Sequence, residues 1–498
     1  MANSIEPINL RSTDGHHLTT RQIGIRFIAP AVGCLLALFV GWFVSSELNP
    51  FTTTVILTAV VMFIVAVCNP TAGVYFLILT SGYLDLVKRL GILSDAMSGS
   101  DVVITLAVAP LLFVSICVGV IYRNVINRTW LKPWQVALAA VIIATMAGVF
   151  VQAFFRGGGP LFALKDFANT GAYLPLTLVV SFLFPDTIRV QRLLTFCLWV
   201  YIPVALYGIW QQFFGLTDFE TDYLKSGFTV EITLLDDVRL RPFSTLNSPH
   251  ALGIVTAMLS ALAAFVPLKN GKRVKWQIVV ALLFAAACIA TFARAAWVLL
   301  ALAGLVWVCC RSKVGTMVLY GVALTGFAAL ILNSDTLLRS LEQLDSYLPK
   351  DSDAEAQAFR ITTFSERLIS FRNVLTNPEF HTWFGNRSQV YEDLAEESHD
   401  NVAHDQIGQI LVNFGFVGLG FFLGVTVLAL IIAHRAIFHQ RDPPRRKMML
   451  GCLSVLIATL LSGMLFGSHL GLFPVNIYFA LLAGCFCSLN MDGKPNAA

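Results

Sequence analysis

Apolar residues run along this chain in stretches of about 17 to 25, separated by short segments with charged residues, prolines or glycines. A helix of that length crosses a hydrocarbon core about 30 Å thick, whereas a helix on a soluble protein shows one apolar and one polar face. The pattern therefore predicts an all-α integral membrane protein, a polytopic bundle of about 14 transmembrane helices with a range of about 12 to 14.

The predicted helices begin and end at charged residues, prolines or glycines. They lie near 27–46, 51–68, 70–84, 102–122, 134–154, 161–184, 193–214, 249–267, 276–293, 295–310, 314–333, 405–433, 448–466 and 470–489. The count falls to about 12 or 13 if the third helix, or one of the pair within 276–310, does not cross the membrane. The first helix follows a polar tail and has no small-residue cleavage site after it, so we expect an uncleaved signal anchor.

Basic residues gather in the short segments that this helix order places on one side of the membrane. The tightest groups lie at 269–275 and 441–447, and most of the 34 Lys and Arg residues share their side. By the positive-inside rule this side is the cytoplasm, and both termini are inside. The predicted divisions are a cytoplasmic tail over 1–26, a transmembrane bundle over 27–333, a large extracytoplasmic loop over 334–404, C-terminal transmembrane helices over 405–489 and a cytoplasmic tail over 490–498.

Two segments on the outer side are long enough to carry chemistry, 215–248 and 334–404. The larger loop contains two short amphipathic helices, because apolar residues recur there at helical spacing. One set is Leu337, Leu341, Leu344 and Leu348, and the other is Ile361, Phe364, Leu368, Phe371 and Leu375. Such helices are expected to lie on the outer leaflet or to cap a cavity between the bundle and the loop.

Composition agrees with this architecture, because 56% of the 498 residues are hydrophobic and only 13% are charged, about half the charged share of a soluble domain. The partners predicted at this stage are membrane lipids. The net charge of +4 is too small to indicate a nucleic-acid partner. All ten cysteines fall in or at the end of apolar runs, so neither a disulfide framework nor a cysteine metal site is predicted.

Arginines lie at two predicted boundaries of the membrane. Arg239 and Arg241 stand before the helix at 249–267, and Asn247 follows them among turn-forming residues. Interface anchoring, or pairing with the aspartates just before them, would explain both arginines without a site. Arg294 is the only charge between 276 and 310, so its guanidinium must snorkel, pair or face a water-filled cavity at the outer face.

Histidines close the large loop, and the second of them stands where the helix over 405–433 begins. His399 and His404 lie among acidic residues, and Asp405 follows directly. Their spacing in a loop gives no fixed helical face, so no metal site is predicted. The helix is longer than the hydrocarbon thickness, so its first turns should project outward and place His404 at the mouth of a cavity. The role that suits His404 is a general base or an oriented hydrogen-bond donor.

These elements, in this order on a polytopic bundle, resemble the O-antigen ligase and polysaccharide polymerase superfamily. Four family motifs carry the resemblance over about 239–430. They are an Arg followed by Asn-Pro-Asn before a helix, Thr-x-Ser-Arg at a helix end, a loop Arg followed by an aromatic residue, Pro and Gly, and His-Asn before a Gly-x-x-Gly pair. In this sequence they are Arg241 with Asn247 and His250, Thr291 with Arg294, Arg367 with Phe371, Pro378 and Gly385, and His404 with Gly415 and Gly418. Two positions depart from the family pattern, because Asp405 replaces the usual Asn and Ala293 the usual Ser.

The resemblance implies transfer of a glycan from undecaprenyl diphosphate to an acceptor sugar hydroxyl at the outer face of the bacterial inner membrane, with the active site and the large loop in the periplasm. Negative charge develops on the leaving diphosphate, which planar arginines stabilise through bidentate contacts. We expect Arg294 in this catalytic role. The expected donor-diphosphate-binding residues are Arg241, Arg239 and Arg367.

The attacking sugar hydroxyl must lose its proton, and a neutral His404 is suited to receive it. The resemblance implies that the reaction inverts the anomeric carbon. We expect no cofactor and no metal, because neither a nucleotide-sugar loop nor a DxD-type metal site is evident. The expected supporting residues are Asp405, Asn247 and His399.

The shared motifs leave the acceptor open. A polymerase would extend the lipid-linked chain of surface polysaccharide or O-antigen repeat units, and we favour it because the superfamily is most diverse there. A ligase would transfer the chain to lipid A core, and a protein O-glycosyltransferase is a third reading. A flippase or transporter for the same lipid is the alternative from another class, and it predicts midplane charges or broken helices in two corresponding halves. A chain-length regulator or a flippase is the protein partner that a polymerase implies.

Overall fold

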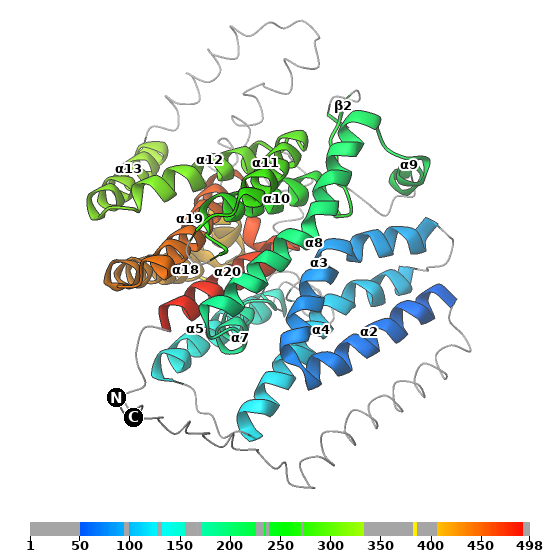
Figure 1. The fold of residues 1–498 in the computed structure, drawn as a ribbon, viewed down its shortest axis with the longest axis horizontal. Helices are drawn as coiled ribbons and strands as arrows, with labels where there is room; N and C mark the ends of the chain where they lie inside the picture. The colour runs from blue at the N-terminus through cyan, green and yellow to red at the C-terminus, as the bar shows by residue number, and fades with distance from the viewer. Residues whose placement is uncertain are drawn as a thin grey trace, which may run out of the picture.

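The computed structural model describes residues 50–93, 99–126, 132–154, 167, 171–225, 234–235, 239–269, 272–332, 382–385 and 406–491. These residues form helices joined by short connections, with one antiparallel pair of two-residue strands, β1 Leu234–Leu235 and β2 Arg239–Leu240 (Figure 1). The prediction of a helical integral membrane protein is confirmed. The predicted helix at 27–46 and both amphipathic helices of the large loop lie outside the described residues.

Most helix bounds follow the apolar runs closely, but for the predicted helix at 161–184 the described residues show a turn over 171–175 and a helix over only 176–183. In the first half the helices are α2 Pro50–Cys68, α3 Pro70–Leu93, α4 Gly99–Ile126, α5 Pro133–Ala153, α7 Leu176–Leu183, α8 Thr187–Phe214 and α9 Asp218–Lys225. In the second half they are α10 Pro249–Phe265, α11 Lys275–Ala290, α12 Arg294–Cys309, α13 Lys313–Leu332, α18 Gln406–His439, α19 Pro443–Phe466, the 3-10 turn η4 His469–Gly471, and α20 Val475–Met491. The predicted pair within 276–310 is two separate helices. α3 continues past its predicted end at 84, because the charged residues that follow lie inside the helix.

Six helices among the described residues are long and apolar enough to cross a membrane: α2, α4, α5, α8, α18 and α19. Helices α10, α11, α12 and α20 are apolar but shorter. With 16 residues each, α11 and α12 are about 24 Å long at roughly 1.5 Å per residue, slightly less than the hydrocarbon thickness. The chain is thus a multi-pass helical membrane protein, and the total of about 14 spans stays a prediction.

Helix α10 occupies the centre of the second half and packs against α8, α11, α12, α19 and α20. Nearly all of its residues are buried, including the small residues that let neighbouring helices approach. A Cβ on Gly253 would lie 2.7 Å from Thr291 Oγ1 and 2.9 Å from Ala293 Cβ, so only glycine lets the first turns of α10 and α12 pack this closely. The helix starts of α10 and α12 are therefore neighbours.

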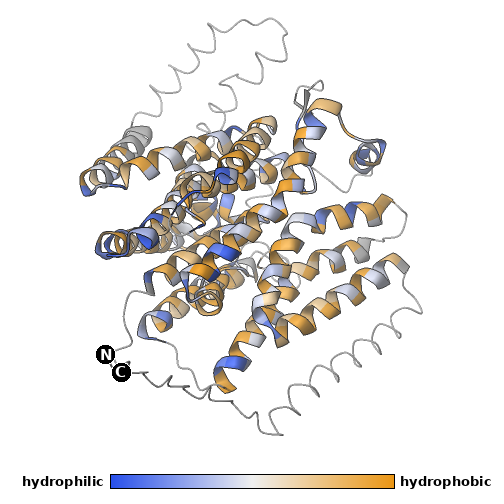
Figure 2. Cartoon of the chain, viewed as in Figure 1, coloured by the Kyte–Doolittle hydropathy of each residue, from blue (hydrophilic) through white to orange (hydrophobic). Residues whose placement is uncertain are grey.

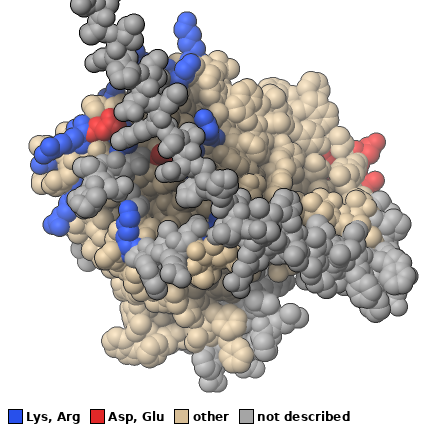
Figure 3. All heavy atoms as spheres, turned by 60° about the horizontal axis from the view of Figure 1, so that its bottom comes forward, with Lys and Arg blue, Asp and Glu red and all other residues tan. Residues whose placement is uncertain are grey.

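One end of the bundle is basic, and segments far apart in the sequence meet there. The guanidinium groups of Arg273 and Arg311 lie over the same Trp307 ring, at 5.0 and 4.1 Å from its centroid. Arg445 Nε donates to Thr187 Oγ1 at 3.2 Å, which joins the starts of α19 and α8. Figure 3 shows Lys and Arg side chains gathered on one side of the visible face, and Figure 2 shows hydrophilic residues mostly near the helix ends.

The described segments at this basic end are those whose basic residues predicted the cytoplasm, and they are 186–192, 269, 272–275, 311–313 and 441–447. The segments that the next section describes meet at the other end, which the same topology assigns to the outside. The alternation of these segments across the membrane stays a prediction. Which side of the membrane each end faces stays a prediction.

Candidate active site

The structure brings together two of the predicted arginine motifs. Arg241 follows strand β2, and its Nε donates to the main-chain carbonyl of Thr291 at 3.3 Å. Thr291 is the C-cap residue of α11 and lies three residues before Arg294, so the Arg241 and Arg294 motifs are neighbours. Arg241 directly follows the β1–β2 hairpin, in which Leu234 pairs with Leu240.

The turn that presents Arg294 is tight and held by hydrogen bonds. Thr291 Oγ1 donates to the Cys288 carbonyl at 2.7 Å and accepts from Ala293 N at 3.2 Å. Phe292 between them has φ 51°, a left-handed conformation that is unusual for a bulky residue. Such strained turns persist where the surrounding structure over-determines them, and this one sets where Arg294 begins α12.

The start of α12 is electropositive for two reasons. Aligned peptide dipoles place partial positive charge at a helix N-terminus, and Arg294 adds a full charge at the first helical position, where a cation is electrostatically disfavoured. The N-cap residue Ala293 makes no side-chain cap to the first N–H groups. This is the position where the family pattern has Ser, which is able to cap. The start of α10 adds a second helix N-terminus beside it.

Two histidines lie beside these helix starts: His250, which belongs to the predicted Arg241 motif, and His469, which the sequence analysis did not single out. His250, in the first turn of α10, and His469, in η4, have ring centroids 5.4 Å apart. His469 is fully buried, and its Nε2 lies 3.0 Å from Ser462 Oγ, which donates to the Ala295 carbonyl at 2.8 Å. The connection between α19 and α20 is thereby fixed against the first turn of α12.

The start of α18 contacts the segment around His469. Gln406 Oε1 accepts from Ser468 Oγ and from Leu470 N, both at 3.3 Å, and these two residues flank His469. Gln406 comes two residues after His404 in the sequence. The C-terminal His motif thus leads into a helix whose first residue contacts the cluster around α10 and α12.

A short piece of the large loop, 382–385, joins the bundle at a kink in α18. Gly415 has φ 63° and ψ −165° inside the helix, and the N–H groups that follow it turn outward. Phe416 N donates to the Thr382 carbonyl at 3.0 Å and Val417 N to the Trp383 carbonyl at 3.1 Å. Gly415 therefore has a structural role, because its backbone conformation allows the loop backbone to bond directly to the helix backbone.

A network of buried charged and polar side chains, absent from the sequence predictions, lies under the Arg241 segment. The Arg89 guanidinium from α3 is 1% exposed, and its Nη1 lies 3.7 Å from a Glu220 carboxylate oxygen of α9 that is fully buried. Arg89 Nη2 donates to the Leu246 carbonyl at 2.7 Å, and the guanidinium lies over the Phe243 ring at 4.7 Å. Arg89 thus connects α3 and α9 to the segment between Arg241 and α10.

Helix α8 completes this network through Gln211. Its Nε2 donates to the Glu220 carboxylate, which also accepts from Tyr207 Oη at 2.8 Å. The Gln211 Oε1 atom accepts from Phe243 N at 3.1 Å and from Ser244 N at 2.7 Å. Ser244 has φ 55°, so these bonds hold the backbone in an otherwise unfavourable conformation. The backbone that follows Arg241 is consequently fixed on both sides.

Asn247, predicted as a supporting residue, contacts the same helix α3. Its Oδ1 accepts from Lys88 Nζ at 3.1 Å, and Lys88 Nζ also lies 3.5 Å from the Asp85 carboxylate. Both charged side chains are nearly buried. The signal that could have indicated this site is the spacing of Asp85, Lys88 and Arg89, which puts three charges on one face of a helix directly after an apolar run.

The other predicted site residues are placed only in part or not at all. Arg239 lies in β2, and its backbone pairs opposite Leu235. Four other predicted site residues lie outside the described residues: Arg367, His399, His404 and Asp405. Within the described ranges, no group of three His, Cys, Asp or Glu side chains is arranged to hold a metal ion.

Fold and site together define a multi-pass helical membrane protein with an electropositive, multi-helix site at one end of its bundle. Residues 279–423 match the model of a family described as O-antigen ligase. The predicted resemblance to the O-antigen ligase and polysaccharide polymerase superfamily is thereby confirmed. The match includes Arg294, Arg367 and His404, and Arg241 lies before it. No curated protein matches the sequence.

Proposed function

We propose that this protein transfers a glycan from undecaprenyl diphosphate to an acceptor sugar hydroxyl during synthesis of a surface polysaccharide. The observation that carries the proposal is the contact of Arg241 with Thr291, which brings the arginine of one family motif to the turn that presents Arg294. The family match over 279–423 supports glycan transfer of this class.

The electrostatics of the helix starts suit a diphosphate leaving group. As the bond to the anomeric carbon breaks, negative charge grows on the phosphate oxygens, and Arg294 with Arg241 would bind them through bidentate contacts. The N-termini of α10 and α12 add positive potential at the same place. Arg239 and Arg367 are the further donor-binding residues of the proposal.

The acceptor hydroxyl attacks the anomeric carbon and loses a proton, and we assign His404 as the base that takes it. His404 precedes Gln406 by two residues, and Gln406 contacts the η4 segment beside the starts of α10 and α12. Asp405, Asn247 and His399 are the proposed supporting residues. In this mechanism the reaction needs no metal and inverts the anomeric carbon, so turnover should survive extensive chelation.

Polymerisation of lipid-linked repeat units is the first candidate reaction. Transfer to lipid A core is the second candidate, and the description of the matching family as O-antigen ligase favours it. Both reactions release undecaprenyl diphosphate, so they differ only in the acceptor. Either would take place at the periplasmic face of the bacterial inner membrane, with the basic end of the bundle in the cytoplasm.

The test is a single-turnover transfer assay with purified protein, a lipid-diphosphate glycan and each of the two acceptors. Release of undecaprenyl diphosphate together with an elongated acceptor is the expected result, and the preferred acceptor distinguishes polymerase from ligase. A flippase would instead move the intact lipid without releasing the diphosphate. Absence of release with both acceptors, from a protein that binds the donor, would reject the proposed reaction.

A matched pair of variants tests the arginine role. Arg294→Lys keeps the charge but loses the bidentate fork, which should slow transfer roughly tenfold to a hundredfold. Arg311→Lys, just beyond the other end of α12, makes the same change at the basic end and should leave transfer unchanged. Normal transfer by Arg294→Lys would show that Arg294 only extends its charge to the membrane surface and does not bind the diphosphate.

A further inference from the structure

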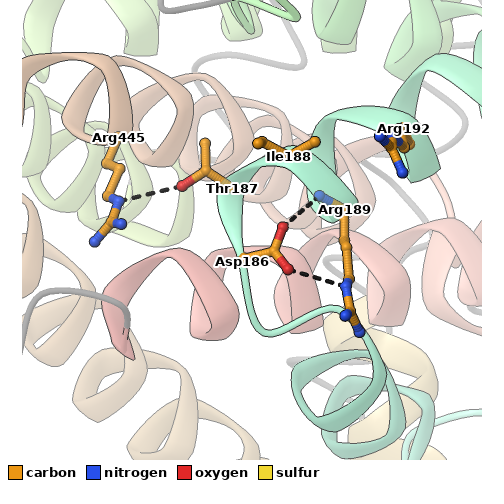
Figure 4. A pocket seen from close by; sticks show the side chains of 6 residues that line it. All are labelled: Asp186, Thr187, Ile188, Arg189, Arg192 and Arg445. Atoms are coloured by element: carbon orange, nitrogen blue, oxygen red, sulfur yellow. Dashed lines mark hydrogen bonds and ion pairs between the residues drawn. The ribbon is translucent and has the colours of Figure 1, made fainter. Parts of the chain in front are cut away.

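A hollow at the basic end of the bundle is separate from the proposed active site. It has a volume of about 370 Å³ and lies where the start of α8 meets the start of α19. Three arginines line it, together with Asp186, Thr187 and Ile188 (Figure 4). These arginines are Arg189, Arg192 and Arg445.

The positive charge of this hollow is only partly balanced. Asp186 lies 2.9 Å from Arg189 Nε and also caps α8 by accepting from Arg189 N at 2.8 Å. Asp442 lies 3.2 Å from Arg445 Nε. Within the described part of the chain, no carboxylate forms an ion pair with Arg192. Three arginines against these two carboxylates leave a net positive charge, so the hollow attracts an anion.

An apolar groove continues from the hollow along α8. Its volume is about 330 Å³, it shares Ile188 and Arg192 with the hollow, and it extends past Phe196 to Trp199. Ile188 and Trp199 are 61% and 58% exposed, on the side of α8 that faces away from the protein core. Trp199 stacks on Trp276 with ring centroids 5.8 Å apart, and Trp side chains favour the boundary between headgroups and hydrocarbon.

We propose that the hollow and the groove together bind one anionic phospholipid from the leaflet at the basic end. The phosphodiester would lie between Arg189, Arg192 and Arg445, and an acyl chain would lie along Ile188, Phe196 and Trp199. A soluble anion would use the arginines but gain nothing from the apolar groove. The combination of an arginine cluster with a lipid-facing apolar groove is therefore specific for a lipid.

The site is independent of the transfer reaction, so it is tested by lipid binding. Full-length protein in neutral detergent is titrated with dioleoyl phosphatidylglycerol, dioleoyl phosphatidylcholine or inorganic phosphate, and bound lipid is counted by native mass spectrometry. Phosphatidylglycerol should bind, and the other two should not compete with it. Arg192→Gln should weaken binding about tenfold, because it removes one charged hydrogen-bond donor.

The matched control is Arg441→Gln, which removes the same charge from the same end of the molecule but outside the hollow. It should bind phosphatidylglycerol as the unchanged protein does. Trp199→Ala should weaken binding of the dioleoyl lipid but not of dihexanoyl phosphatidylglycerol. Arg189→Gln replaces Arg192→Gln if the latter lowers the Tm of the lipid-free protein.

Three results would overturn the proposal. Unchanged binding by the variants of the hollow would show that these arginines do not hold the lipid. Equal losses in Arg441→Gln would indicate a general surface-charge effect. Displacement of the lipid by inorganic phosphate would identify a simple anion site.

Discussion

The guanidinium of Arg89 in α3 lies 3.7 Å from the carboxylate of Glu220 in α9, and both side chains are buried. Arg89 Nη1 is buried and has no hydrogen-bond partner among the described residues, so the carboxylates of Asp85 and Glu220 compensate its charge. Through the Leu246 carbonyl, the same arginine holds the segment that follows Arg241. A part of the molecule outside the matched family segment thus positions a proposed donor-binding residue.

Arg89→Met should lower the stability of the folded protein by about 3 to 5 kcal/mol, because it leaves the Glu220 carboxylate buried without its cation. Arg189→Met is the matched control. It removes the contact with Asp186, which is shorter than the Arg89–Glu220 contact but exposed to solvent. Such surface pairs contribute about 0 to 1 kcal/mol to the stability of the folded protein. Thermal unfolding in detergent measures both variants. The double variant Arg89→Met with Glu220→Leu should be less destabilised than the sum of the two single variants.

Gly415→Ala should disrupt the junction between α18 and the 382–385 segment. The added Cβ would run into the Thr382 carbonyl oxygen and lie 2.5 Å from the Trp383 carbonyl oxygen, and Gly415 has a backbone conformation that only glycine readily adopts. Overpacking of this kind typically destabilises by about 1 to 3 kcal/mol. Gly424→Ala in the same helix meets no atom within 4 Å and should not lower the Tm. Equal Tm values for the two variants would contradict the assigned role of the kink.

His404→Ala should reduce single-turnover transfer about a hundredfold or more, with little change in donor affinity, because positioned proton transfer contributes about that factor. His439→Ala, at the other end of α18, serves as the matched control and should transfer normally. A parallel loss of donor binding and transfer would instead make His404 a binding residue. A lowered Tm would assign it a structural role.

The predicted orientation can be checked with single cysteines in a cysteine-free background. Lys272→Cys lies at the basic end, and Asp353→Cys lies in the large loop. A membrane-impermeant maleimide should label position 353 in intact spheroplasts and position 272 only after the membrane is opened, because basic short loops remain in the cytoplasm. Labelling of both positions from one side would refute the topology and the periplasmic placement of the site.

The arginine motifs could be predicted because their residue types stand out in an apolar context. Arg294 is the only charge between 276 and 310, and a cation in that position needs a water-facing or paired environment. Asp85, Lys88 and Arg89 were missed because their position after an apolar run resembles an ordinary helix end. Their burial depends on α9 and the 241–247 segment packing over them, which no local pattern encodes.

The sequence by itself determined that this protein is a helical membrane protein and where most of its described apolar helices lie. Apolar runs of bilayer length leave few alternatives, because in hydrocarbon a backbone must satisfy its own hydrogen bonds. Tertiary structure alone decided the pairing of Arg89 with Glu220, the approach of Arg241 to Thr291 and the bonding of 382–385 to the α18 kink. These contacts join segments far apart in the chain through shape and burial, whereas sequence periodicity specifies only which face of each helix is apolar.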